Sequence, residues 1–443
     1  MPEYGIFGFQ TLEDLEAEVE ARTLGIPFDR DLSVLGKPVS IGACKAPNAL
    51  MIHPMEGRDA DLEGSPGPLT FRRYERYGRG GAGLIWFEGT AIMPESRSSP
   101  SQLILIPKNE GPWKRLLDRT RKAASEHGSS HHPVCILQLQ DVGRQRKIPG
   151  VPPAVLFQNP YWYFPADAPL MTDSDIESLE DRFVEGALLA CRIGFEGIDI
   201  KSSNGYLGSD FLAAHNRKGR YGGTFEGRTR FLLNIVDKIR GRAPKDFLVT
   251  VRLNLYDGIP YPYGWGVSRE DVKVPDLTEP VMLGRALQER GVKLINTSNG
   301  IPEYNPHLIR PYSIPVKGVV PPAEHPLETV SRIFRVVGDF QTSLPKVKVV
   351  GTAYSWLRQF AGYAAAAALK ANRSSLIGMG RMAFAYPDFP KDLLEKGRLD
   401  PGRVCVTCSR CTQILRWGGS TGCALRDREI YGRIYQNLER ENP

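Results

Sequence analysis

Eight short apolar segments, each followed by a polar turn and a helical stretch, recur between residues 46 and 390. They are ALMIH (49–53), GLIWFE (83–88), VCILQLQ (134–140), GIDIK (197–201), FLVTVRL (247–253), KLINTS (293–298), KVKVVG (346–351) and SLIGMG (375–380). Because these segments lack a regular alternation of apolar and polar residues, we expect strands that are buried on both faces, as in a parallel sheet. Eight strands that alternate with helices predict a (β/α)8 TIM barrel, and a doubly wound open sheet is the alternative.

The stretches between the expected strands carry the apolar spacing and the end signals of helices. Ser174 and Glu177 have the spacing of a capping box at the start of one helix, and Gly194 follows its last apolar position. Residues 231–239 contain another apolar stripe, and Thr278 begins a further helix. Each of these helices would turn one apolar face toward the sheet.

Two regions lie outside the expected barrel, which we place at residues 46–390. Residues 1–45 form an N-terminal extension with an acidic helix from about Thr11 to Ala21. Residues 391–443 form a C-terminal segment that contains a cysteine cluster.

The composition is that of a globular protein. Apolar residues make up 41% of the chain, and the 24% of charged residues are spread along it, which excludes a disordered chain. No long apolar window suggests a membrane span, and the acidic N-terminus does not resemble a signal peptide, so we expect a cytoplasmic protein. The net charge of +7 arises without a basic run, so we expect no nucleic-acid partner.

Polar and charged side chains follow the expected strands, at the end of a (β/α)8 barrel where active sites form. The residues at these ends are Glu56, Glu88, Gln138, Lys201, Asn204, Tyr206, Arg252, Asn296 and Arg381. The last two strands end in Gly351-Thr352 and in Gly378-Met379-Gly380-Arg381. Glycine amides together with a guanidinium can bind a phosphate there, and glycines that serve only tight turns are the alternative.

Four cysteines in the C-terminal segment have the spacing CxxCxxC followed by a fourth after eleven residues: Cys405, Cys408, Cys411 and Cys423. Three thiolates within seven residues and a fourth after a loop favour a [4Fe–4S] cluster. Structural zinc more often uses two separated CxxC pairs and is the alternative. The three other cysteines are scattered, and we expect them to be buried thiols in a reducing compartment.

These segments together resemble the old yellow enzyme family, and in particular its iron–sulfur branch, which includes 2,4-dienoyl-CoA reductase and trimethylamine dehydrogenase. The resemblance begins at APNALMIHPMEG (46–57) and continues through GAGLIWFEGTAI, LQLQDVGRQ and the long segment GFEGIDIKSSNGYLGSDFLAAHNRKGRYGGTFEGRTRFLLNIVDKIR. It then covers VRLNLYDG, VVGTAYS, IGMGRMAFAYPDFP and the cysteine cluster. It therefore includes both the barrel and the C-terminal segment.

The resemblance implies an FMN that is held noncovalently at the barrel mouth. It places Gln138 at the pyrimidine edge of the flavin and Arg252 at the N1/O2 side, where a cation stabilises the anionic reduced flavin. Glu56 departs from the family, which usually has Thr or Cys near the flavin at that position. The other implied flavin contacts are Pro54, Met55 and Gly89, with Gly351, Gly380 and Arg381 at the phosphate.

On the substrate side, Lys201 stands where many family members carry a histidine that binds the substrate carbonyl. Asn204 and Tyr206 follow at matching spacing. We predict that Lys201 and Asn204 hold an activating oxygen, while Tyr206 gives a proton to Cα after hydride from flavin N5 reaches Cβ. A salt bridge from Lys201 to Glu56 or Glu88, without substrate contact, is the alternative.

The predicted function is an FMN- and [4Fe–4S]-dependent oxidoreductase that reduces the activated C=C bond of a small-molecule enone or enoyl thioester. One alternative is an amine dehydrogenase or demethylase that passes electrons out through the cluster, with aromatic residues of 157–169 and 259–265 around the amine. Another is an electron-transfer subunit of a larger redox complex. Lys201 argues against a cationic substrate.

The source of electrons is left open between two partners. Multidomain relatives continue into FAD- and nicotinamide-binding domains, whereas this sequence stops at residue 443. Either NAD(P)H reduces the FMN directly, or a separate electron-transfer protein exchanges electrons through the cluster. Association into a homo-oligomer is left open as well.

Overall fold

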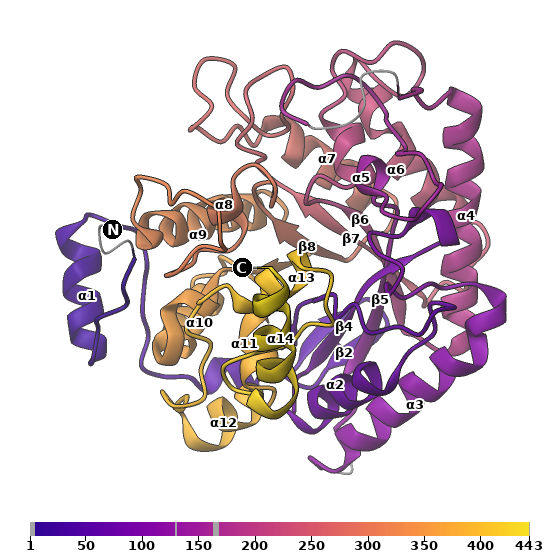
Figure 1. The fold of residues 1–443 in the computed structure, drawn as a ribbon. Helices are drawn as coiled ribbons and strands as arrows, with labels where there is room; N and C mark the ends of the chain where they lie inside the picture. The colour runs from indigo at the N-terminus through magenta and orange to yellow at the C-terminus, as the bar shows by residue number, and fades with distance from the viewer. Residues whose placement is uncertain (1–4, 129–130, 163–167, 443) are drawn as a thin grey trace.

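Eight parallel strands form a closed barrel in the computed structural model, which describes residues 5–128, 131–162 and 168–442 (Figure 1). Around the barrel the strand order is β10-β3-β4-β5-β6-β7-β8-β9. The strands are β3 (Leu50–Ile52), β4 (Leu84–Ala91), β5 (Val134–Gln140), β6 (Gly197–Ser202), β7 (Leu248–Asn254), β8 (Leu294–Ser298), β9 (Lys348–Gly351) and β10 (Leu376–Met379). The closed ring confirms the TIM barrel and excludes the open sheet, and each strand coincides with one of the eight apolar segments.

Helices surround the barrel and cover the outward faces of the strands (Figure 1). The longer ones are α2 (Pro68–Arg79), α3 (Glu110–Ser125), α4 (Asp173–Ile193), α6 (Phe225–Arg240), α7 (Thr278–Glu289), α9 (Pro326–Ser343) and α10 (Ala361–Lys370). Shorter helices follow the ends of β6, β8 and β10: α5 (Leu207–Leu212), α8 (Pro306–Ile309) and α11 (Arg381–Ala385). These short helices lie on the loops where sequence analysis placed the site.

The start of α4 differs from the prediction. Its N-cap is Thr172, whose side chain accepts a hydrogen bond from the Asp175 backbone N–H, and Asp175 completes the capping box. The predicted pair, Ser174 and Glu177, is therefore wrong by two residues, because threonine and aspartate fill the same two roles earlier in the chain. Gly194 ends the helix as predicted, with a φ of 106° that favours glycine.

Alternation along the strands separates two hydrophobic clusters. Met51, Trp86 and Ile136 belong to a small cluster inside the barrel. Their sequence neighbours, such as Ile52 and Phe87, belong to the large cluster between the barrel and the helices. Since side chains alternate along a strand, every second residue counted from an inner-cluster residue of that strand points into the barrel.

A two-stranded hairpin closes the amino-terminal end of the barrel. Its strands β1 (Val39–Ile41) and β2 (Cys44–Ala46) pair antiparallel. Ile41 and Ala46 are fully buried and belong to the inner cluster, next to residues such as Leu84 at the strand starts. The opposite end, where polar residues end the strands, remains the open mouth.

The two terminal regions pack against the outside of the barrel. Helix α1 (Leu12–Ala21) begins after Thr11, as predicted, and the chain that follows it bonds to α9 and α10 through Gly25 and Asp29. The C-terminal helices α12 (Phe389–Lys396), α13 (Arg410–Arg416) and α14 (Arg433–Glu441) lie on the same side of the barrel as α10 and α11 (Figure 1). In the part of the chain that the structure describes, no helix is long and apolar enough to cross a membrane.

Replacing Ile41 with Ala should lower the free energy of unfolding by about 2–5 kcal/mol, because it leaves a cavity in the inner cluster under the barrel. The adjacent exposed residue gives a matched control, since Ser40→Ala should change stability by less than about 0.5 kcal/mol. Urea unfolding followed by far-UV circular dichroism measures both. Equal effects from the two variants would contradict the hairpin's role as a plug.

Candidate functional site

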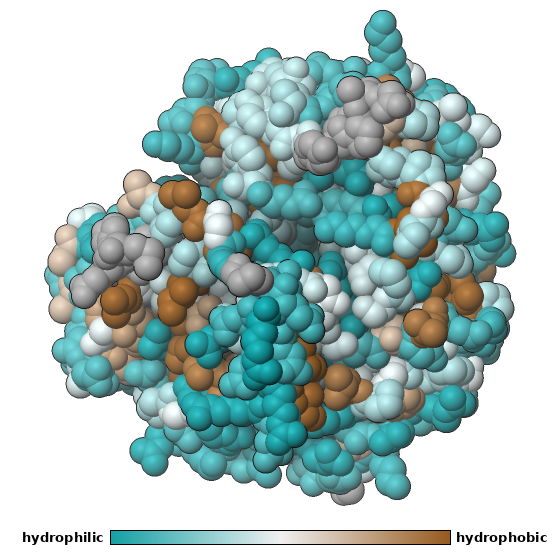
Figure 2. All heavy atoms as spheres, viewed as in Figure 1, coloured by the Kyte–Doolittle hydropathy of each residue, from teal (hydrophilic) through white to brown (hydrophobic). Residues whose placement is uncertain are grey.

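Three polar side chains from adjacent strands lie in one row at the open mouth. Lys201 on β6 is paired in register with Arg252 on β7, and Arg252 is paired with Asn296 on β8. All three continue the inward-facing series of their strands, so they point into the barrel above its apolar layers. Figure 2 shows a hollow near the centre of the viewed face, with mainly hydrophilic residues around it.

A cavity of about 160 Å³ at this mouth brings many of the predicted residues together. Those that line it are Pro54, Met55, Lys201, Asn204, Arg252, Gly380 and Arg381. Asn204 has a left-handed φ of 68°, and its Oδ1 accepts a hydrogen bond from Ser203 Oγ. Predicted residues from four regions of the chain thus converge on one place, as the barrel prediction required.

Lys201 is held by a small polar network beside the cavity. Its Nζ donates to Gln140 Oε1 at 2.6 Å and lies 3.5 Å from Glu56 Oε1, while Gln140 Nε2 donates to the same Glu56 oxygen at 2.9 Å. The ammonium also lies 4.0 Å from the centre of the Tyr206 ring, a cation–π contact. Glu56 and Tyr206 therefore join the site through Lys201.

Burial sets the protonation of this network. It lowers the pKa of Lys201 to about 8, although the neighbouring Glu56 carboxylate partly offsets the effect. Burial also lowers the pKa of Arg252 to about 10 and raises the pKa of Tyr206 well above its ordinary value. Near neutral pH the mouth thus holds a charged lysine, a charged arginine and a protonated tyrosine.

Gln138 lies one layer deeper in the barrel than the sequence suggested. Its Nε2 donates to Asp199 Oδ2 at 2.5 Å, and the same oxygen accepts from Trp86 Nε1 at 2.9 Å. Burial raises the pKa of Asp199 to about 6. Gln138 is therefore part of the floor beneath the cavity, and its contact with a flavin stays a prediction.

Glu88 has a different role from the one expected at a strand end. The pairing of β4 with β5 is irregular between Phe87 and Thr90, and Glu88 lies at this irregularity. Its carboxylate binds Arg73 of α2 and accepts from the Gly57 backbone N–H at 2.7 Å. The ion pair of Lys201 is accordingly with Glu56 and not with Glu88. Gly89 lies next to the Glu56–Gln140 pair, where a Cβ would collide with both side chains.

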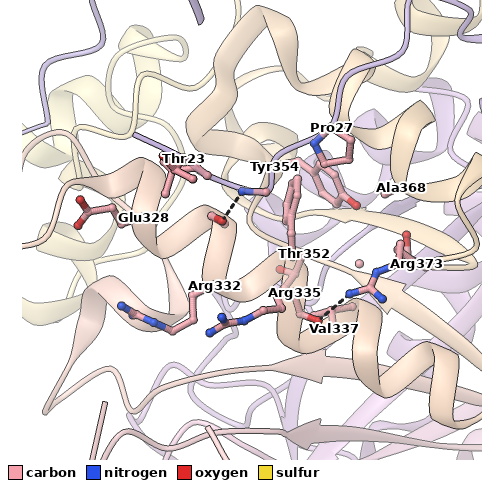
Figure 3. A pocket seen from close by; sticks show the side chains of 16 residues that line it. Thr23, Pro27, Glu328, Arg332, Arg335, Val337, Thr352, Tyr354, Ala368 and Arg373 are labelled. Atoms are coloured by element: carbon pink, nitrogen blue, oxygen red, sulfur yellow. Dashed lines mark hydrogen bonds between the residues drawn. The ribbon is translucent and has the colours of Figure 1, made fainter. Parts of the chain in front are cut away.

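A larger cavity, of about 530 Å³, lies outside the barrel between α9, α10 and the segment after α1 (Figure 3). Gly351 lines this outer cavity and is absent from the lining of the mouth, whereas the next residue, Thr352, lines both. A Cβ on Gly351 would lie 2.7 Å from Tyr354 Oη. The phosphate contact predicted for Gly351 would have to be made by its backbone. We place the site at the smaller cavity because the strand ends and their inward polar side chains meet there.

Aromatic residues from the loops that follow β5, β7 and β8 meet above the barrel. The Tyr161 ring contacts the rings of Tyr263 and Tyr304 edge to face, with centroids 5.9 and 5.5 Å apart. Trp162 lies under the guanidinium of Arg144, which is 3.9 Å from the ring centre. The loops thus form one aromatic wall, as expected, although residues 163–167 of the first loop lie outside the described residues.

The four clustered cysteines line one small cavity: Cys405, Cys408, Cys411 and Cys423. Backbone N–H groups of Thr407 and Arg426 each donate to a cysteine sulfur, at 3.4 Å. Thr407 and Ser409 both have left-handed φ angles, which wrap the loop around the cavity. Among the residues that the structure describes, no three His, Cys, Asp or Glu side chains are placed to hold a single metal ion.

The cysteine cavity and the mouth cavity share part of their walls. Arg381, Phe384 and Cys411 line both. Arg310, which sequence analysis did not single out, also lines the mouth, and burial together with the nearby Arg381 lowers its pKa to about 10. Two guanidiniums beside a thiol make this wall strongly cationic.

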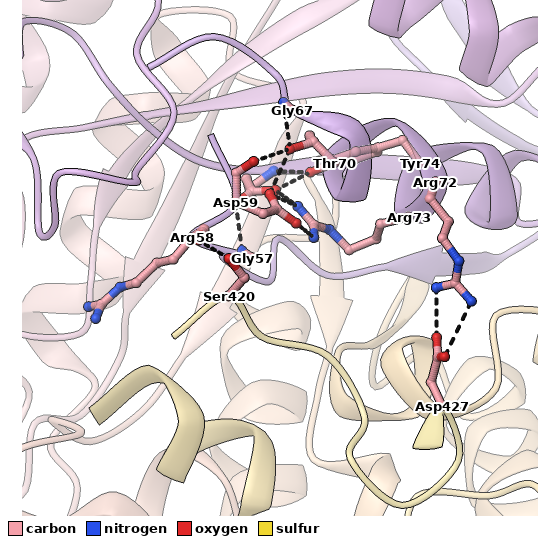
Figure 4. A network of polar contacts seen from close by, with 11 residues as sticks. Gly57, Arg58, Asp59, Gly67, Thr70, Arg72, Arg73, Tyr74, Ser420 and Asp427 are labelled. Atoms are coloured by element: carbon pink, nitrogen blue, oxygen red, sulfur yellow. Dashed lines mark hydrogen bonds and ion pairs between the residues drawn. The ribbon is translucent and has the colours of Figure 1, made fainter. Parts of the chain in front are cut away.

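A buried ion-pair network holds the loop after β3 against α2, and hydrogen bonds from the cysteine segment hold the other side of this loop (Figure 4). Arg73 binds both Asp59 and Glu88 and is 4% exposed. On the other side of the loop, the Gly57 carbonyl accepts from the Thr421 backbone N–H at 2.7 Å, and Ser420 Oγ donates to the Arg58 carbonyl. The loop that carries Met55 and Glu56 is therefore fixed from both sides.

Sequence reasoning missed several residues of the site, and His53 is the clearest case. It ends the apolar segment ALMIH, and its position two residues after Met51 continues the inward-facing series directly after β3. The alternation of side chains along the strand could therefore have identified His53 from the sequence. Asp199 could have been found in the same way, but nothing in a single sequence marks Arg73 or Arg310 as neighbours of the mouth.

Comparison with known proteins agrees with this geometry. Residues 35–262 match the model of the NADH:flavin oxidoreductase / NADH oxidase family. The NADH oxidase of Thermoanaerobacter brockii is 24% identical over 404 residues, which are 90% of this chain and 54% of the relative. The chain thus spans about half the length of that relative.

Solved structures show the same fold at low sequence identity. A 2-naphthoyl-CoA reductase superposes with a TM-score of 0.70 at 20% identity, over 91% of this chain and 58% of the other. A histamine dehydrogenase from Rhizobium sp. 4-9 superposes with a TM-score of 0.67 at 21% identity, over 89% and 52%. These likenesses concern the fold alone.

The mouth contains buried polar groups that the described part of the chain leaves without partners. Arg252 Nε and both polar side-chain atoms of Asn296 are buried with no hydrogen-bond partner in the described part of the chain, so they can bind the polar edge of a ligand. A Cβ on Gly380 would lie 2.7 Å from Met55 Sδ, so a larger residue there would have to displace the Met55 side chain. The geometry of the mouth and the match over residues 35–262 lead to one conclusion: the chain belongs to the NADH:flavin oxidoreductase / NADH oxidase family, a family of flavin-dependent enzymes.

Proposed function

We propose that this chain is an FMN- and [4Fe–4S]-dependent oxidoreductase that reduces the activated C=C bond of an enone or an enoyl thioester. The observation that carries the proposal is the convergence of Lys201 and Asn204 on one cavity with Arg252, while Tyr206 packs against Lys201. This arrangement offers two hydrogen-bond donors for an activating oxygen and one protonated phenolic hydroxyl beside them.

Bound FMN would supply the hydride for this reduction. Pro54, Met55, Arg252, Gly380 and Arg381 would hold it, because they line the mouth. Arg252 offers a positive charge toward the pyrimidine edge of the flavin, and Arg381 offers one toward its phosphate.

The protein groups act on the other reactant. The Lys201 ammonium and the Asn204 amide donate hydrogen bonds to the carbonyl oxygen, which withdraws electrons from the conjugated double bond. As the hydride is added to Cβ, Tyr206 Oη transfers its proton to Cα, and solvent later restores that proton. The raised pKa of Tyr206 keeps the hydroxyl protonated throughout the neutral range.

The charge of the mouth disfavours the amine alternative. Its charged lining residues are Lys201, Arg252, Arg310 and Arg381, and no carboxylate lines the cavity within the described chain. A cationic amine would be repelled there, whereas a carbonyl oxygen that gains negative charge would be stabilised.

The cysteine cavity supports a cubane more than zinc. A single zinc ion holds its thiolates at about 2.3 Å, so the sulfurs must gather within about 4 Å of one another. A [4Fe–4S] cluster distributes its four thiolates over four irons and needs a wider spread. Four cysteines around one cavity, three of them within seven residues and the fourth after a loop, agree with such a cluster. Bound there, the cluster would supply one-electron redox chemistry next to the flavin.

The test of the proposed function is an anaerobic visible spectrum of the purified protein during titration with NADPH and NADH. We expect about four irons and one FMN per chain, and bleaching of the flavin by one of the nucleotides. Cofactors that stay oxidised with both nucleotides, but are reduced by dithionite, would instead identify an electron-transfer subunit that needs a protein donor. A colourless protein that contains zinc would overturn the redox function.

Cysteine variants assign the metal in the same measurement. Cys408→Ser should lose most of the iron, since Cys408 lines the cysteine cavity, while FMN content is largely retained. Cys191→Ser is the matched control, because Cys191 lies on α4, far along the chain from the cluster, and should keep the full iron content. If Cys408→Ser kept as much iron as Cys191→Ser, the assignment of the cluster to the C-terminal segment would be wrong.

Replacing Tyr206 with Phe should slow C=C reduction by about 10²–10⁴-fold, the usual contribution of a general acid. Reduction of the flavin by its donor should stay unchanged, because the substitution removes only the hydroxyl. Stopped-flow measurement of the two half-reactions, with 2-cyclohexenone as the oxidant, separates these effects. An unchanged oxidative rate would show that another group protonates Cα.

The pKa of Lys201 predicts a pH dependence. Since burial lowers this pKa to about 8, the ammonium is present below pH 8 and is lost above it, so kcat/KM should fall as the pH rises through that value. Glu56→Gln removes the carboxylate that favours the ammonium, and the fall should move to lower pH. Lys201→Met should lose most of the activity, and its kcat/KM should no longer fall near pH 8. Lys201→Arg should also lose this pH dependence but keep part of the rate. If kcat/KM of Lys201→Met still fell near pH 8, the pH dependence would belong to another group.

A further inference from the structure

His53 lies at the mouth without a role in the proposed reaction. It follows β3 directly, its backbone N–H donates to the Met379 carbonyl of β10 at 3.2 Å, and its side chain lines the same cavity as Arg252 and Gly380. Only 5% of the residue is exposed. Its place in the inward series after Met51 directs the ring into the barrel, at the wall of the mouth cavity.

Both ring nitrogens of His53 lack a protein partner. Nδ1 and Nε2 are buried, and neither makes a hydrogen bond within the described residues. A neutral imidazole carries one N–H donor and one acceptor, and burying both unpaired is costly. Burial lowers the pKa of His53 well below its ordinary value, and the nearby Arg252 adds to this, so the ring is neutral. A ligand at the mouth could satisfy these atoms.

The neighbouring strand is shaped to receive this ring. A Cβ on Gly378 of β10 would collide with the imidazole, whose Nε2 is its nearest neighbour. Gly378 therefore leaves the space that His53 fills. The ring thus fits into the barrel wall, and the guanidinium of Arg252, from a strand on the opposite side of the barrel, is close enough to affect it electrostatically.

We propose that His53 is a cofactor-binding residue of this chain, whose neutral imidazole hydrogen-bonds the polar pyrimidine edge of bound FMN beside Arg252. The proposal rests on the FMN that family membership implies and does not depend on the substrate. Asn296, which is likewise buried without a partner in the described chain, lies next to Arg252 and would share this edge. A hydrogen bond at this edge stabilises the anionic reduced flavin more than the oxidised form, so His53 would also raise the flavin's reduction potential.

The test compares His53→Phe and His53→Gln. Phenylalanine keeps a planar ring of similar size but cannot hydrogen-bond, whereas glutamine keeps a donor and an acceptor on a side chain of similar reach. FMN binding to the flavin-free protein is followed by quenching of flavin fluorescence, and the potential is measured by dye-coupled titration. We expect His53→Phe to bind FMN at least tenfold more weakly and to have a more negative potential, and His53→Gln to recover most of both.

His131→Gln is the matched control, because His131 is also buried but bonds to the Ala82 carbonyl at the strand starts, away from the mouth. His131→Gln should leave both the FMN affinity and the reduction potential unchanged. Far-UV circular dichroism and thermal unfolding of the flavin-free proteins check folding, and His53→Asn replaces either variant if it unfolds. Wild-type affinity and potential in His53→Phe would overturn the proposal, as would weaker binding with an unchanged potential. Neither result would affect the assignment of Lys201 and Tyr206.

Discussion

The buried ion pairs of Arg73 hold the loop after β3, which carries Met55 and Glu56 of the site, against β4. Arg73 comes from α2, outside the barrel, yet it binds Asp59 in the loop after β3 and Glu88 at the irregular end of β4. Removing one member of such a cluster would leave an uncompensated buried charge, which is strongly destabilising. The loop between Pro54 and Asp59 is therefore held in place by these ion pairs, and the C-terminal segment binds to its other side through Ser420 and Thr421.

The mouth carries more positive charge than the protein itself neutralises. Lys201 has Glu56 as a partner, but Arg252 and Arg310 lie where burial lowers their pKa values to about 10, and Arg310 faces a second guanidinium, Arg381. Such an arrangement costs free energy in the absence of an anion. A phosphate and a ring system that becomes anionic on reduction would both relieve that cost, so the charge pattern matches the chemistry of FMN.

The fold could be predicted from the sequence because its signal is repeated eight times. Each apolar segment was buried on both faces, and the alternation with helices left a closed ring as the favoured arrangement. The strand-end rule also located Lys201, Asn204 and Arg252 at the mouth. Contacts between distant segments could not be predicted in this way. Glu88 turns toward Arg73 because β4 is irregular, Gln138 pairs with Asp199 one layer down, and Gly351 faces outward, and each depends on a register or a bulge that no local pattern encodes.

One short element connects the two candidate cofactor sites. Helix α11 begins at Arg381, which lines both the mouth and the cysteine cavity, and its Met382 sulfur accepts from the backbone N–H of Cys405 at 3.5 Å. The C-terminal segment has only a small hydrophobic cluster of its own, around Ile414, Ala424 and Tyr431. It therefore relies on the barrel for its conformation. A change in charge in one cavity acts on the other across this single guanidinium, so the mouth and the cysteine cavity are electrostatically coupled.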